Sequence, residues 1–291
     1  MSDPQIMTAE IAVAQRLEVG ESARWIDDAL HWVDVPTGRR FAWREGAAEI
    51  ETTEHAGIVT AVFDAGAGRI GVVARDSVDV PGAPPIALGI TEGRSNDARV
   101  DPTGGLWVGT WTPDVEARTA RLMHLTTGVA PLLGSLTMSN GIGFIGESAY
   151  HVDTFARTVS RYRLDRAGGI TEFDDGSVTA EFVTVADALP DGLTVDADGG
   201  VWVALWGGGC ARRYDPSGHC THEVHTPGVS QVSSVALGGA DRRTLFLTTA
   251  AEEVTEAAAG SVFHARVESA GVREHVFRGA RSGATEEENS V

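Results

Sequence analysis

The sequence predicts an all-β protein that folds as a six-bladed β-propeller, and an internal repeat is the main observation behind this prediction. Two segments are closely similar, residues 101–111 (DPTGGLWVGTW) and residues 196–206 (DADGGVWVALW). In each segment an Asp and a Gly pair favour a tight hairpin turn, and the apolar residues that follow favour a half-buried strand. The chain therefore uses one turn-and-strand unit repeatedly.

Four weaker copies of this strand raise the number of repeats to six. They are HWVD at 31–34, GVVA at 71–74, AYHVD at 149–153 and TLFLT at 244–248. The copies recur at roughly 35 to 50 residues, a period that is typical of propellers and solenoids and that accommodates four short strands. With 35 glycines and few amphipathic helical stretches, the composition also favours short strands joined by turns.

The length and composition predict one domain. A chain of 291 residues with 42% apolar residues can bury a large core without a second domain. We expect the propeller to span residues 9–281, with flexible ends at 1–8 and 282–291, because neither end has an apolar pattern. The Glu- and Ala-rich segment 251–260 predicts a short helix or loop over one face of the propeller, beside a pocket.

The charge of the chain limits its partners. A formal net charge of −18 argues against binding to nucleic acid or to an anionic membrane, which both attract basic surfaces. No stretch reaches the roughly 18 apolar residues that cross a membrane, and the amino terminus lacks the pattern of a secretion signal. We therefore expect a cytoplasmic protein with reduced Cys210 and Cys220, whose partners are neutral molecules or cations. Nothing in the sequence predicts an oligomeric state.

Two familiar motifs do not fit their usual chemistry in this chain, and a third is absent. Residues 66–71 (GAGRIG) match a dinucleotide-binding pattern, but the apolar residues that follow favour a strand and not a helix, so we expect a hairpin turn. His222 and His225 would face opposite sides of a strand, which argues against a shared metal ion. The chain has no complete Gly-x-Ser-x-Gly motif, so a hydrolase here would have to activate water without a serine nucleophile.

Polar residues stand near the start of four repeats. They are Glu21 and the segments 94–97 (RSND), 139–141 (SNG) and 190–192 (PDG). The innermost strand of each propeller blade lines the central channel, so equivalent positions in different blades converge near the axis. The carboxylates of Glu21 and Asp191 and the amide oxygen of Asn140 would form an oxygen-only set that suits Ca²⁺ or Mg²⁺.

Purely structural roles are the alternative for the same residues. Asn-Gly and Asp-Gly pairs favour turns, Arg94 could form a surface salt bridge, and Asn96 could form an Asx turn. The recurrence of these residues at equivalent points of separate repeats favours a joint functional role. Trp111 and Trp206 lie near strand ends, where we expect them to pack between blades and not to line a pocket.

Taken together, these motifs resemble the regucalcin and gluconolactonase family. The resemblance rests on GES at 20–22, SND at 95–97, DPTG at 101–104, SNG at 139–141, Asp153 and PDG at 190–192, and it extends from about Val19 to Gly279. It implies one divalent cation in the central channel, bound by Glu21, Asn140 and Asp191, with Ca²⁺ favoured over Mg²⁺, Mn²⁺ or Zn²⁺. It also implies that Arg94, Asn96 and Asp114 contact the substrate.

The activity implied by the resemblance is that of a metal-dependent lactonase acting on a small sugar lactone. The cation would polarise the carbonyl, and Asp191 would position or deprotonate the attacking water. If Trp111 and Trp206 did line the pocket, a substrate flatter or more apolar than a sugar lactone would become an alternative. The alternatives are a phosphotriesterase-like hydrolase, a hydrolase of a specialised ester or lactone, and a non-catalytic calcium-binding propeller.

Overall fold

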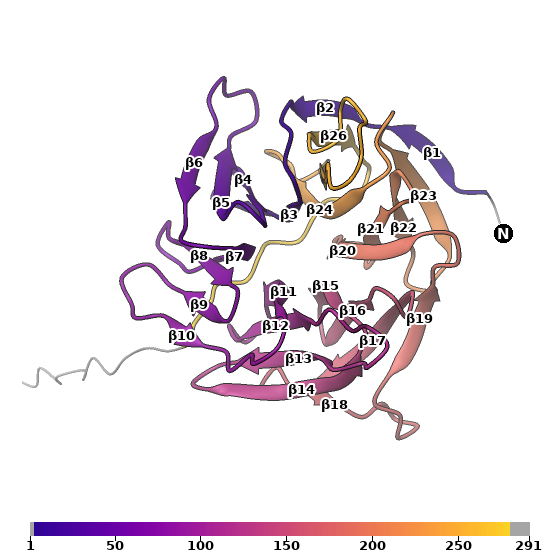
Figure 1. Cartoon of the computed structure of the whole chain (residues 1–291). Coiled ribbons are helices and arrows are strands. Elements are labelled where there is room, and N and C mark those ends of the chain that lie inside the picture. Colours follow the sequence, from indigo (N-terminus) through magenta and orange to yellow (C-terminus); the bar gives the residue numbers. More distant parts are fainter. Residues whose placement is uncertain (1–2, 280–291) are drawn as a thin grey trace, which may run out of the picture.

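Six sheets surround a central channel in the computed structural model, which describes residues 3–279 (Figure 1). The described residues form strands, turns and loops without an α-helix, and the innermost strands of neighbouring blades contact one another around the ring. The predicted six-bladed, all-β propeller is therefore confirmed. None of the described residues belongs to a helix long and apolar enough to span a membrane.

Each blade is an antiparallel sheet whose first strand lies at the channel. Blade one contains β3 (Gly20–Ile26), β4 (Ala29–Asp34), β5 (Arg39–Trp43) and β6 (Glu51–Glu54). Blade two contains β7 (Val59–Asp64), β8 (Ile70–Ala74), β9 (Ser77–Asp79) and β10 (Ile86–Ala87). Blade three contains β11 (Arg94–Val100), β12 (Leu106–Trp111), β13 (Ala120–Leu125) and β14 (Val129–Leu136).

The other three blades follow the same plan with additions at their outer edges. Blade four contains β15 (Ser139–Ile145), β16 (Ser148–Asp153) and β17 (Thr158–Leu164), with both β18 (Ile170–Thr171) and β19 (Ala180–Thr184) paired to β17. Blade five contains β20 (Leu189–Val195), β21 (Val201–Trp206), β22 (Cys210–Tyr214) and β23 (Cys220–His225). Blade six contains β24 (Val232–Gly238), β25 (Thr244–Thr249) and β26 (Val262–Arg266).

The amino-terminal segment closes the ring. Strand β2 (Glu10–Val13) pairs antiparallel with β26, so the start of the chain completes the last blade. Strand β1 (Gln5–Thr8) pairs in parallel with β23. The structure thus corrects the expectation of a flexible end at 1–8 for residues 5–8, while residues 1–2 lie outside the described residues. The side chains of β1 are mostly exposed, so this strand is held by backbone pairing to an otherwise open sheet edge and carries no apolar pattern in the sequence.

The six repeats found in the sequence are the second strands of six different blades. They correspond to β4, β8, β12, β16, β21 and β25. Trp107 and Trp202 occupy equivalent places on β12 and β21, Trp32 lies on β4, and all three are fully buried. The ring of Trp107 meets the ring of Phe144 edge to face, with centroids 5.0 Å apart. Burial of apolar side chains between blades, at about 1.5–3 kcal/mol each, is the main stabilisation of such a core.

The Asp and Gly residues of the two strongest repeats form the predicted hairpin turns. The Asp196 carboxylate accepts hydrogen bonds from the backbone N–H groups of Asp198 (3.1 Å) and Gly200 (2.8 Å), and Asp101 accepts from Thr103 and Gly105 in the same way. The first glycine of each Gly-Gly pair has a positive φ, +94° at Gly104 and +81° at Gly199. The segment 66–71 likewise lies in the hairpin between β7 and β8.

A β-bulge marks the start of every innermost strand. The pairing register shifts between Glu21 and Arg24 in blade one, between Ser95 and Ala98 in blade three, and between Ser139 and Ile142 in blade four. The remaining three blades shift at equivalent places. Because a bulge bends the strand and redirects its side chains, these shifts turn polar residues toward the channel entrance.

The carboxy-terminal segment covers the opposite end of the channel. This segment, residues 267–279, crosses the ring from blade six toward blade two, where it is drawn in yellow (Figure 1). It is anchored by the Phe277 N–H, which donates to the Asp64 carbonyl at 2.9 Å, and by the Arg278 N–H, which donates to the Gly104 carbonyl at 2.8 Å. The predicted flexible end at 282–291 lies outside the described residues.

Candidate active site

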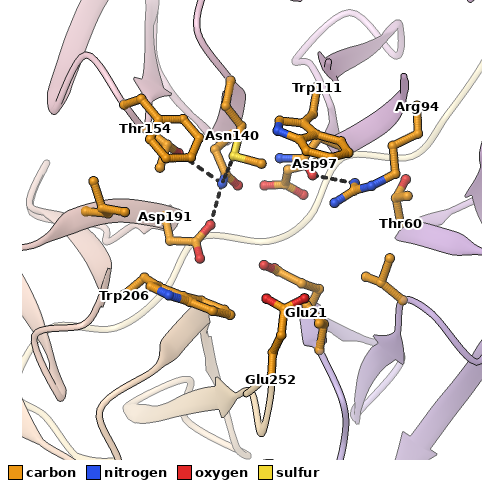
Figure 2. A pocket seen from close by; sticks show the side chains of 16 residues that line it. Glu21, Thr60, Arg94, Asp97, Trp111, Asn140, Thr154, Asp191, Trp206 and Glu252 are labelled. Carbon is orange, nitrogen blue, oxygen red and sulfur yellow. Dashed lines mark hydrogen bonds between the residues drawn. The ribbon is translucent and has the colours of Figure 1, made fainter. Parts of the chain in front are cut away.

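A cavity of about 360 Å³ opens at the channel entrance, where the innermost strands begin (Figure 2). All six blades contribute to its wall. Its lining residues are Val19, Glu21, Val35, Thr60, Arg94, Asn96, Asp97, Trp111, Met138, Asn140, Thr154, Phe155, Leu189, Asp191, Trp206 and Glu252. A cavity of this size accommodates a single substituted ring with its immediate contacts.

The structure brings together the three residues predicted to bind a cation. Glu21 comes from β3, Asn140 from β15 and Asp191 from β20, and their side chains face one another across the cavity (Figure 2). The Asn140 side-chain amide donates to the Asp191 carboxylate and, at 3.1 Å, to the Thr154 hydroxyl. Asn140 and Asp191 are 4% and 5% exposed, so the site is shielded from bulk water.

Burial and neighbouring acids raise the pKa values of both carboxyl groups of this set. Burial, followed by repulsion from Asp191 and Asp97, raises the pKa of Glu21 well above its usual range. Burial, followed by repulsion from Asp97, likewise raises the pKa of Asp191. The Arg94 guanidinium lowers both pKa values but does not offset these effects. The protein alone therefore leaves a deficit of positive charge at this point.

The chemistry of these residues fits a hard divalent cation. Two carboxylates and one amide offer oxygen ligands only, which suits Ca²⁺ or Mg²⁺ better than a thiophilic ion. The Asn140 side-chain nitrogen donates to Asp191, and its amide oxygen is the atom that could bind a cation. Among the described residues there is no group of three or more His, Cys, Asp or Glu that could hold a metal ion. Because Ca²⁺ takes six to eight oxygen ligands, water or substrate would have to complete the shell begun by these three side chains.

Arg94 and Asn96 lie together on one side of the cavity. One amino group of Arg94 donates to the Asn96 side-chain oxygen at 2.6 Å and to the Ser95 carbonyl at 2.9 Å. The Arg94 guanidinium also stacks over the Trp111 ring, 5.1 Å from its centroid. The Asn96 amide donates to the Ser139 carbonyl at 3.0 Å, which connects this pair to the strand that carries Asn140. Both side chains are thus held in fixed orientations.

The structure corrects two expectations about the cavity wall. Asp114 does not reach the cavity: it is exposed in the loop after β12, and its carboxylate accepts a hydrogen bond from the Ala117 N–H at 3.1 Å. Trp111 and Trp206 line the cavity and do not pack between blades, because they are the last residues of second strands and their rings lie at the channel entrance (Figure 2).

Several cavity residues could not be predicted from the sequence. Thr60 lies at the bulge of β7, the position in blade two that corresponds to Glu21, but it is neither an acid nor an amide. Glu252 comes from the segment 251–260, which forms turns and not a helix in the described structure. The acidic composition of this segment and its expected place beside a pocket were the available signals for Glu252.

Asp97 differs from the other acids of the cavity because it has a buried basic partner. Its Oδ1 atom accepts hydrogen bonds from Arg24 and from the Ala98 N–H, both at 2.8 Å. Its Oδ2 atom is buried and has no hydrogen-bond partner among the described residues. Arg24 is 1% exposed and does not line the cavity, whereas Asp97 does, so the ion pair extends from the cavity wall into the buried part of the channel.

Comparisons with known proteins relate the chain to lactonases and regucalcins. The family model described as "SMP-30/Gluconolactonase/LRE-like region" matches residues 19–251. The pentonolactonase XacC of Haloferax volcanii is 33% identical over 298 residues, covering 91% of this chain and 96% of that protein. The 6-deoxy-6-sulfogluconolactonase of Pseudomonas putida is 30% identical, covering 94% of this chain and 99% of that protein.

The solved structures agree on the fold. A calcium-binding protein, regucalcin, from Agrobacterium tumefaciens superposes with a TM-score of 0.85 at 22% identity, covering 95% of this chain and 100% of that chain. A gluconolactonase from Xanthomonas campestris superposes with a TM-score of 0.70 at 17% identity, covering 89% of each chain. At these identities the likeness establishes a shared propeller architecture.

Proposed function

Because this chain belongs to the SMP-30/gluconolactonase/LRE-like family, we propose that it is a metal-dependent lactonase that opens a small sugar lactone with water. The observation that carries the proposal is the convergence of Glu21, Asn140 and Asp191 at the base of a cavity large enough for one ring. The relatives are named for the hydrolysis of pentonolactones and of a sulfonated gluconolactone, which supports the reaction class.

Each cavity residue has a role in this proposal. A divalent cation, when bound, would supply Lewis-acid polarisation of the lactone carbonyl. Glu21, Asn140 and Asp191 would hold it, and the Asp191 carboxylate would also position the attacking water and accept its proton. Arg94 keeps Asn96 in place with one amino group and has further N–H donors to offer to oxygen atoms of the substrate. Trp111 and Trp206 provide flat apolar surfaces against which a ring can lie.

The balance of charge favours an uncharged substrate. Among the described residues, four carboxylates line the cavity, those of Glu21, Asp97, Asp191 and Glu252, and Arg94 contributes the one guanidinium of its wall. A divalent cation and the buried partner of Asp97, Arg24, would bring the ionised groups to near neutrality. An anionic substituent on the ring would then meet the exposed Glu252 at the cavity rim.

The test is hydrolysis of a lactone panel by metal-stripped protein, with Ca²⁺, Mg²⁺, Mn²⁺ or Zn²⁺ added back. We expect cation-dependent opening of uncharged five- or six-membered sugar lactones, at roughly five- to tenfold higher kcat/KM than a phosphorylated lactone. Glu252→Gln should reduce that preference. Cation binding without turnover would favour a non-catalytic calcium-binding propeller, and faster hydrolysis of a phosphotriester or an apolar lactone would favour one of the other hydrolases.

Arg94→Ala should weaken substrate binding more than it slows the chemical step. Its guanidinium contacts Asn96 and Trp111 at the cavity wall and is not one of the proposed cation ligands. We expect KM to rise about tenfold, because the loss of one hydrogen bond to a charged group weakens binding by about 1.5 kcal/mol, with a smaller change in kcat. Steady-state kinetics measure both constants. Arg163→Ala, which removes a guanidinium from an exposed ion pair with Asp174, is the matched control.

We also propose that the protein acts in the cytoplasm and uses no disulfide. The two cysteines are free thiols, of which Cys210 is buried. Burial raises the pKa of the Cys210 thiol to about 11, so it stays protonated and unreactive at neutral pH. Persistent thiols are typical of a reducing compartment, which supports this location.

A further inference from the structure

Beneath the cavity, one buried arginine connects the strands that carry two of the proposed cation ligands. Arg99, on β11, donates from a single amino group to the Ile142 carbonyl and to the Leu193 carbonyl, both at 3.0 Å. Its other amino group donates to the Thr194 hydroxyl at 3.1 Å. Ile142 lies two residues after Asn140, and Leu193 lies two residues after Asp191. The same guanidinium therefore holds β15 and β20 just below the ligand pair.

The carboxylate that balances Arg99 comes from the far end of the chain. Glu274 receives hydrogen bonds from two nitrogens of Arg99, one of them at 3.1 Å. Burial alone would raise the pKa of Glu274, but the guanidinium groups of Arg99 and Arg24 outweigh burial and lower it, so the carboxylate is ionised at neutral pH. The segment 267–279, which carries Glu274, is fixed to blades two and three by Phe277 and Arg278.

The strands that Arg99 connects share no hydrogen-bonded ladder. β15 and β20 belong to different sheets, and each has a register shift at its channel end. Their backbones also approach closely there, because a Cβ atom on Gly141 would lie 2.5 Å from the Asp191 carbonyl oxygen. The distance between Asn140 and Asp191 is thus set by packing between blades and by the two carbonyls that Arg99 binds.

We propose that Arg99 is a positioning residue that fixes the spacing of Asn140 and Asp191, with Glu274 as its counter-ion. The carboxy-terminal segment is then part of the cation site although it lies at the opposite end of the channel. This inference rests on the proposed function in one respect, that Asn140 and Asp191 bind a cation. Arginine suits the task because its planar guanidinium binds two carbonyls and a carboxylate at once, which a lysine ammonium cannot reproduce.

The test is direct cation binding by Arg99→Lys, compared with Arg213→Lys as a matched control. Arg213 is also buried and ion-paired, to Asp196, and lies in the same blade as Asp191 but contacts neither inner-strand carbonyl. Tb³⁺ luminescence sensitised by Trp111 and Trp206 reports binding without any substrate, and Ca²⁺ competition gives its affinity. We expect Arg99→Lys to weaken Ca²⁺ binding about tenfold and to lower kcat more than it raises KM.

The outcomes separate the inference from the proposed function. Unchanged Ca²⁺ affinity in Arg99→Lys, or an equal loss in Arg213→Lys, would overturn the positioning role even if the enzyme is a lactonase. No cation binding by the unaltered protein would overturn both. Cation binding without lactone turnover would overturn the proposed lactonase activity, but the Ca²⁺ affinities of the two variants would still test the role of Arg99. If Arg99→Lys does not fold, Glu274→Gln should show a smaller loss of affinity, and an unchanged value there would overturn the proposal.

Discussion

Asp191→Asn should reduce lactone hydrolysis at least about 1000-fold, because it removes a proton acceptor and a charged cation ligand in one step. Asparagine has nearly the same shape and can still contact Asn140. The loss of activity would therefore come from the missing charge and proton acceptor and not from a packing defect. The measurement is kcat with saturating cation and substrate. Asp187→Asn, which removes an acid from an exposed ion pair with Arg212, should retain normal turnover.

Although Asp191→Asn should abolish most turnover, we do not expect it to lower the thermal stability of the metal-free protein. Burial, followed by repulsion from Asp97, raises the pKa of Asp191, so without a cation its charge opposes folding at neutral pH. Asp191→Asn should therefore unfold at a temperature no lower than the unaltered protein when both are free of metal. Turnover above one-tenth of the normal rate would show that Asp191 is not the base, and a large loss of stability would show that it has a structural role instead.

The fold could be predicted because its signals are local. Each turn needs an Asp and a Gly, and each second strand needs a run of apolar residues, so both appear within about ten residues of sequence. Strand β1 has neither signal, since its pairing with β23 uses backbone groups and leaves most of its side chains exposed. A strand that buries little is not distinguishable from a flexible end by its composition.

The site could be predicted only as far as the repeats could be superposed. Glu21, Asn140 and Asp191 stand at equivalent points of three blades, and the propeller geometry brings such points together. Arg99 and Glu274 are 175 positions apart and follow no repeat, so their contact depends on where the carboxy-terminal segment crosses the channel. The position of Asp114 could not be predicted either, because it depends on the path of a loop that leaves the rim and exposes the side chain.

The stabilisation of the protein by Ca²⁺ should increase with pH. The folded-state pKa values of Glu21 and Asp191 are raised, so in the metal-free protein these groups contribute stability at low pH that is lost as pH rises through those values. A bound cation removes this loss because it favours the ionised form of both carboxyls. At a concentration 100-fold above its Kd, the cation should contribute about 2.7 kcal/mol. For a chain of this size that corresponds to a rise of roughly 5–10 °C in Tm.

The measurement is the Tm with and without Ca²⁺ at pH 5 and at pH 8. Asp191→Asn is the decisive control, because it leaves only one carboxyl in the set and should lose most of both the Tm shift and its pH dependence. An equal shift at the two pH values in the unaltered protein would place the ion elsewhere, for example on exposed acids that are already ionised at pH 5. A shift that grows with pH and disappears in the variant would connect the cation to the buried pair, since solvent-exposed carboxylates ordinarily titrate below that range.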